Sequence, residues 1–175
     1  MNEKIAVQNL KSKRNRKTII KKLKEHNIDK NAIIVCIGTP KIILDAVGPK
    51  VGQMLKNNED ILVYGTVDEP ANAITIDRIR VELSEKYPDR KILAIDACLD
   101  CDPSNKLGKF TFRNFGVHPG AGVGKNIEEV GDVSLVVSTC SSENELFFSA
   151  RNEEAYKDFI DDISKDIYEI LNEVF

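Results

Sequence analysis

Two aspartates in this sequence stand where a carboxylate could do acid–base chemistry. Asp45 opens a helical pattern that extends to Lys56, and Asp96 directly follows the largely apolar run 91–95. The dipole and free N–H groups of a helix N-terminus favour an ionised carboxylate at Asp45. A carboxylate at the end of a buried strand loses solvent and holds its proton more tightly, as we expect for Asp96. If the two side chains meet, one can activate water as a base while the other protonates a leaving group.

Each aspartate also has an ordinary structural explanation. Asp45 could be a helix N-cap, which is a common role of aspartate. Asp96 could be a buried carboxylate whose oxygens accept hydrogen bonds from backbone N–H groups. The elements that carry the two residues decide whether they converge.

Three apolar runs, at 32–37, 61–64 and 91–95, alternate with two helical patterns that begin near Asp45 and cover 76–83. Runs that are apolar at every position suit strands covered on both faces, and their alternation with helices is typical of α/β domains. We therefore expect the three runs to be adjacent parallel strands, with helices on both faces of the sheet.

The second half of the chain adds three further elements. The alternating run 109–115 predicts a strand with one exposed face, antiparallel to its neighbour, and 133–137 predicts another buried strand. A long amphipathic helix begins near Glu153. The sequence thus predicts an α/β fold with a mixed, mainly parallel sheet.

Ligand sites in open parallel sheets form outside the carboxyl ends of the strands. The loops after the first two strands bring Thr39, then Asp68 and Glu69, to this edge. A glycine-rich loop over 116–124 is a further contributor, and its backbone N–H groups could stabilise a substrate carbonyl. The residues that we expect to contact a substrate are Thr39, Asp68, Glu69, His118, Gly120, Gly122 and Gly124.

Metal, redox and phosphate sites have weaker signals. Cys98 and Cys101 form a C-x-x-C pair, but the pair follows a strand and no second pair supplies zinc ligands. His118 could join the two aspartates as a metal ligand, although a histidine flanked by glycine and proline is more often structural. The glycine loop lacks the Lys-Ser/Thr ending of a P-loop. We expect no cofactor and no metal, and we expect Cys98 and Cys101 to be unbridged thiols.

Length and charge limit the other possibilities. The 175 residues correspond to about one domain, which we expect over 16–175 behind a flexible basic arm over 1–15. Residues 1–24 hold nine Lys and Arg and one acid, whereas the other 151 residues hold sixteen basic and twenty-seven acidic side chains. The basic segment could contact nucleic acid or an acidic partner. We interpret it instead as a solvated arm and one face of a short helix over 18–26, close to the acidic C-terminus of the same chain.

The same composition predicts the compartment and disfavours two classes of partner. The acidic body would repel phosphate, and the absence of tryptophan disfavours a base-stacking platform, so we expect no nucleic-acid partner. No apolar run reaches the length of a membrane span and no secretory signal is visible. We therefore expect a cytoplasmic protein that makes no membrane contact.

Several ordered motifs resemble the YyaC family of sporulation proteins, which is similar to the germination protease that degrades small acid-soluble spore proteins. The motifs are Val35-Cys-Ile-Gly-Thr-Pro40, Asp45-Ala-Val-Gly-Pro-Lys-Val-Gly52, Tyr64-Gly-Thr-Val-Asp-Glu-Pro70, Ala94-Ile-Asp-Ala-Cys-Leu99, Gly116-Val-His-Pro-Gly-Ala-Gly-Val-Gly124 and Val130-Gly-Asp-Val133. Their succession over roughly 32–145 is far more specific than any one of them.

The resemblance implies a three-layer α/β/α fold of the phosphorylase/hydrolase type, shared with hydrogenase-maturation proteases. Two aspartates of the germination protease are thought to act as an atypical aspartic pair, and they match Asp45 and Asp96. The resemblance thus implies a peptidase that acts on proteins, such as small spore proteins, in the cytoplasm of a spore-forming cell or forespore. Two alternatives stay open. One is a non-catalytic peptide-binding or regulatory protein, and the other is a metal-sensing maturation protease that uses Asp45, Asp96 and His118.

Overall fold

A computed structural model describes residues 2–99, 106–120 and 127–175 of the chain. The strands in this part are β1 (Lys4–Val7), β2 (Ile33–Cys36), β3 (Leu62–Tyr64), β4 (Ile92–Cys98), β5 (Phe110–Arg113) and β6 (Val133–Ser138). They form one sheet with the order β1-β5-β6-β4-β2-β3. The pairs β4–β6, β2–β4 and β2–β3 are parallel, whereas β5–β6 and β1–β5 are antiparallel.

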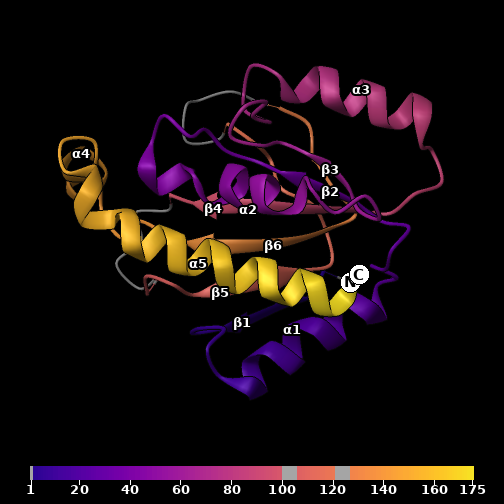
Figure 1. Cartoon of the computed structure of the whole chain (residues 1–175), viewed down its shortest axis with the longest axis horizontal. Coiled ribbons are helices and arrows are strands. Elements are labelled where there is room, and N and C mark those ends of the chain that lie inside the picture. Colours follow the sequence, from indigo (N-terminus) through magenta and orange to yellow (C-terminus); the bar gives the residue numbers. More distant parts are fainter. Residues whose placement is uncertain (1, 100–105, 121–126) are drawn as a thin grey trace.

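The helices cover both faces of this sheet (Figure 1). They are α1 (Lys13–Glu25), the 3₁₀ turn η1 (Ile43–Asp45), α2 (Val47–Leu55), α3 (Ile76–Lys86), α4 (Glu143–Ser149) and α5 (Glu153–Val174). The apolar sides of α1, α2 and α5 share one buried cluster with alternate residues of the strands. The apolar side of α3 packs in a second cluster on the opposite face. The three-layer α/β/α fold is therefore confirmed.

The three apolar runs became adjacent parallel strands because both of their faces are covered. All four residues of β2 are buried, with Ile33 and Val35 in the α3-side cluster and Ile34 and Cys36 in the other. The antiparallel strand β5, the buried strand β6 and the start of α5 also agree with the sequence patterns.

The N-terminal segment differs from the expected flexible arm. Lys4–Val7 is the edge strand β1, which pairs with β5 so that Lys4 lies opposite Arg113. Because this partner is more than a hundred residues away in sequence, no local pattern indicates the pairing. Helix α1 begins at Lys13, five residues earlier than expected. Within the described residues, no helix has the length and apolar character needed to cross a membrane.

Candidate active site

The turn η1 is fixed at the carboxyl end of the sheet by two strand ends. At the end of β2, Gly38 has a φ of +140°, and a Cβ there would lie 2.2 Å from the carbonyl oxygen of Asp45. At the end of β6, the buried hydroxyl of Thr139 donates a 2.7 Å hydrogen bond to the carbonyl of Leu44. Since β4 lies between β2 and β6 and contacts η1, these two attachments hold Asp45 beside the end of β4.

Asp45 is half-buried, and its carboxyl faces the loop that follows β2. Its Oδ2 accepts a 2.8 Å hydrogen bond from the backbone N–H of Thr39. Loss of solvent raises the pKa of Asp45 to about 7, and the Thr39 hydrogen bond opposes only part of this effect. The predicted grouping of Thr39 with Asp45 at this edge is therefore observed.

The helix-capping interpretation of Asp45 is wrong. Helix α2 begins at Val47, and its N-cap is Ala46, while Asp45 is the last residue of η1. The sequence predicts that the helix dipole favours the ionised form of Asp45. Burial has the larger effect, and it raises the pKa of Asp45. A local pattern of apolar spacing cannot distinguish a helix start from a preceding 3₁₀ turn.

Asp96 lies within β4 rather than after it. It pairs with Val136 of β6, and Ile37 flanks it on the β2 side, where the Ile37 N–H donates to the Ile95 carbonyl. The alternation of strand side chains puts Asp96 on the face that α3 covers, as it does Ala94. Asp96 nevertheless keeps partial access to solvent.

The two carboxyl groups interact electrostatically. Burial and, to a smaller extent, the negative charge of Asp45 raise the pKa of Asp96, whereas the Ala97 backbone and the Arg113 cation lower it, and the result is a pKa of about 8. Like charges that are close together resist joint ionisation. Near neutral pH the pair therefore favours a state with one proton, held more strongly by Asp96. This order of proton affinities agrees with the sequence expectation, but its cause is burial of both groups.

Arg113 is a charged neighbour of the pair that the sequence analysis missed. It lies on β5 opposite Ser134 of β6, on the same sheet face as Asp96. Its Nε is buried and has no hydrogen-bond partner among the described residues. Its Cζ stands 6.0 Å from the centre of the Phe115 ring. The signal was present in the run 109–115, where alternation buries Phe110 and Phe112 and turns Arg113 to the other face.

Asp68 and Glu69 are not joined to the aspartate pair by any contact of the described residues. Asp68 forms a 2.8 Å ion pair with Lys56 and also accepts a hydrogen bond from Gln53, so the C-terminal end of α2 and the residue after it hold Asp68 at the outer surface. The backbone N–H of Glu69 donates to the hydroxyl of Thr66 within the turn after β3. Both side chains are exposed. Both residues follow β3 as expected, but their contacts are those of a surface turn.

The described part of the glycine loop shows where two of its predicted residues lie. His118 is exposed and its Nδ1 is 3.3 Å from the carbonyl of Ile127, and Gly120 has a φ of +77°. Within the described ranges, His118 forms no group of three metal-ligating side chains with the two aspartates. Gly122, Gly124 and Cys101 lie outside the described residues.

Comparisons with known proteins place the chain in a family. The chain matches the family model described as "Protein of unknown function (DUF1256)" over residues 6–170. It is similar to the uncharacterized protein YyaC of Bacillus subtilis (strain 168), with 36% identity over 109 residues. That alignment covers 61% of this chain and 52% of YyaC, so the chain spans about half the length of this relative. This similarity confirms the resemblance of the sequence motifs to the YyaC family. Since the family match covers residues 6–170, well over half of the chain, and includes both aspartates, the chain belongs to the DUF1256 family.

Proposed function

We propose that this protein hydrolyses peptide bonds, with Asp45 and Asp96 acting as one acid–base pair. The observation that carries the proposal is the effect of Asp45 on Asp96 between two buried carboxyl groups, whose pKa values are raised to about 7 and about 8 by burial and, for Asp96, also by the charge of Asp45. Perturbed carboxyl groups that keep access to solvent are typical of catalytic sites. The resemblance of the surrounding motifs to the germination protease supports the same chemistry.

The lower pKa assigns Asp45 the role of base. Asp45 takes a proton from a water molecule whose oxygen attacks the peptide carbonyl carbon, and Asp96 gives its proton to the departing amide nitrogen as the C–N bond breaks. The proton on Asp45 then returns to Asp96, directly or through solvent, and restores the starting state. Arg113 limits the rise in the pKa of Asp96, so that Asp96 remains able to release its proton.

A polypeptide substrate also suits the surface beside the pair. Helix α4 contacts η1 and carries Phe147 and Phe148, whose exposed fractions are 73% and 55%. Ile42, just before η1, is also exposed. Exposed aromatic side chains next to a reactive centre can hold apolar side chains of an extended peptide. We propose small spore proteins in the cytoplasm of a spore-forming cell as the substrate class.

The test is peptide-bond cleavage by the wild type and by Asp45→Asn and Asp96→Asn. Each protein is incubated with a small acid-soluble spore protein and with an unfolded casein substrate at several pH values, and products are identified by mass spectrometry. Removing one member of an acid–base pair should lower kcat at least about a hundredfold. Asp162→Asn is the matched control, because Asp162 is exposed and paired with Lys11, and it should cleave at the wild-type rate.

Two outcomes would contradict the proposal. One is cleavage by either active-site variant at the wild-type rate. The other is a folded wild type that cleaves neither substrate at any pH, which would favour the non-catalytic peptide-binding role.

A further inference from the structure

The cations of the N-terminal segment fall into two sets that the sequence does not separate. One set faces the protein and is paired with acids. Lys11 lies 2.9 Å from Asp162, Arg16 contacts Glu169 on α5, and Lys22 is 2.8 Å from Glu3. These ion pairs neutralise part of the positive charge of the segment. They hold the segment against the acidic helix α5 and the edge of the sheet.

The other set forms what we call the α1 cationic face. Its members are exposed side chains on the outer side of α1, namely Lys13, Arg14, Lys17, Lys21 and Lys24. At 3.6 residues per turn they fall within an arc of about 100° along about 17 Å of helix. Among the described residues, only Lys21 of this set has an ion pair, at 3.6 Å from Glu25.

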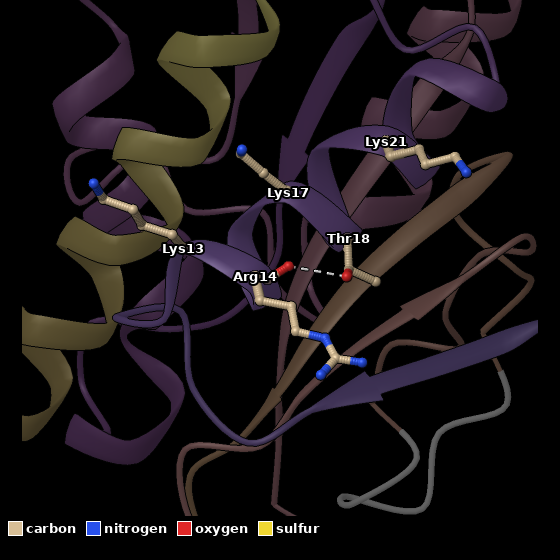
Figure 2. A pocket seen from close by; sticks show the side chains of 5 residues that line it. All are labelled: Lys13, Arg14, Lys17, Thr18 and Lys21. Carbon is tan, nitrogen blue, oxygen red and sulfur yellow. Dashed lines mark hydrogen bonds between the residues drawn. The ribbon is translucent and has the colours of Figure 1, made fainter.

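Figure 2 shows a hollow that four of these cations line together with Thr18. The Thr18 hydroxyl donates a 3.0 Å hydrogen bond to the Arg14 carbonyl, and the long side chains spread outward from the helix. The surface is therefore a continuous stripe of solvated positive charge, while the chain beyond residue 24 carries a net excess of acids.

The composition of the face indicates which kind of partner it suits. Protein interfaces have an apolar, desolvated centre, but the large exposed apolar side chains of the described residues are elsewhere and none lies on α1. Contacts made by lysine, arginine and hydroxyl groups alone are typical of binding to a phosphate backbone. We propose that the α1 cationic face binds the backbone of a nucleic-acid duplex without sequence preference.

This proposal differs from the sequence expectation of no nucleic-acid partner, and the structure supplies the reason. The low aromatic content argues against stacking on unpaired bases, but it does not bear on phosphate contacts to a duplex. The acids of α5 do not neutralise the α1 cationic face, because they pair with the cations that face the protein. A duplex that approaches α1 therefore contacts the five cations of this face before it reaches the acidic part of the protein.

The test measures binding of a fluorescent DNA duplex of about 20 base pairs by anisotropy between about 50 and 200 mM salt. The wild type should bind with a dissociation constant of about 10 µM at the lowest salt, and log K should fall with log salt with a slope of about −4 for four to five phosphates. The Lys17→Glu/Lys21→Glu variant should lose at least about tenfold in affinity and about two units of slope.

The matched control makes the same charge change elsewhere. Arg78 on α3, across the sheet, and Lys157 on α5 are both exposed, and Arg78→Glu/Lys157→Glu should stay within about threefold of wild type. Circular dichroism checks that both variants fold. Asp96→Asn should bind DNA like the wild type, so the result is independent of the proposed peptidase activity.

Three results would overturn the proposal. They are no binding by the wild type at the lowest salt, an equal loss in the control variant, or equal affinity for polyglutamate and for the duplex. The last result would assign the face to acidic polypeptides instead.

Discussion

The buried hydroxyl of Thr139 donates a 2.7 Å hydrogen bond to the carbonyl of Leu44, the residue that precedes Asp45. This bond joins the end of β6 to η1 across ninety-five residues of sequence. It fixes the backbone that carries one aspartate relative to the strand that pairs with the other. The geometry of the pair therefore depends on a residue that has no titratable group.

Thr139→Val should destabilise the protein while keeping the shape of the side chain. The buried carbonyl of Leu44 loses its partner, at a cost of about 1–3 kcal/mol. At this chain length, 1 kcal/mol corresponds to about 2–4 °C in Tm. Thr139→Ser keeps the hydroxyl and should lose less. Thermal unfolding followed by circular dichroism compares them, and a Thr139→Val variant as stable as Thr139→Ser would refute the role of the bond.

Gly38→Ala should be far more harmful than Gly108→Ala, although both glycines have positive φ. At Gly38 a Cβ would lie 2.2 Å from the carbonyl oxygen of Asp45, whereas at Gly108 the nearest atom is 3.7 Å away. Gly108→Ala therefore measures backbone strain alone, and Gly38→Ala adds a clash that must displace η1. We expect Gly38→Ala to lower both Tm and peptidase activity, and Gly108→Ala to lower Tm only. Equal effects on both measurements would show that η1 has room to move.

The aspartate pair should make the protein less stable as pH rises. The folded pKa values of about 7 and about 8 exceed the ordinary aspartate value of 3.8, so between these limits the folded state binds more protons than the unfolded state. Linkage then requires stability to fall as pH rises through that window. Asp96→Asn cannot ionise and should gain Tm over wild type at pH about 8 but not at pH about 4. A constant difference in Tm between the two proteins across this window would contradict the raised pKa.

Arg113→Gln should shift the pH profile of peptidase activity. The Arg113 cation lowers the pKa of Asp96, so its removal raises that pKa further. If Asp96 is the acid, the alkaline limb of the kcat/KM profile should move to higher pH. Arg113→Lys keeps a positive charge and should restore most of the wild-type profile. If the alkaline limb of Arg113→Gln stays at the wild-type pH, Arg113 does not lower the pKa of the catalytic acid.

Much of the fold could be predicted from sequence because its signals are local. Apart from Lys91, the runs 32–37, 61–64 and 91–95 are apolar at consecutive positions, and burial on both faces of a parallel sheet favours that pattern. The strand β1 could not be predicted, because four residues of weak alternation acquire their structure from β5. Tertiary pairing outweighed the polar, basic character of the segment.

The candidate site was predictable in its location but not in its detail. Parallel strands end at one edge, which is why Asp45, Asp96 and Thr39 could be expected together. The 3₁₀ turn depends on Gly38 and on Thr139, two contacts from distant strand ends that leave no local pattern. The catalytic roles of Asp45 and Asp96 stay predictions, as do the substrate contacts of Asp68, Glu69 and His118.

The most direct test of the central claim is the pKa of Asp96, measured by carboxyl-carbon NMR titration in the wild type and in Asp45→Asn. Burial and the charge of Asp45 together predict a wild-type pKa of about 8. A coupled pair also requires a lower pKa in Asp45→Asn, because the negative charge that opposes ionisation of Asp96 is gone. A wild-type pKa near the ordinary 3.8, or one that Asp45→Asn leaves unchanged, would show that the two aspartates do not act as a pair.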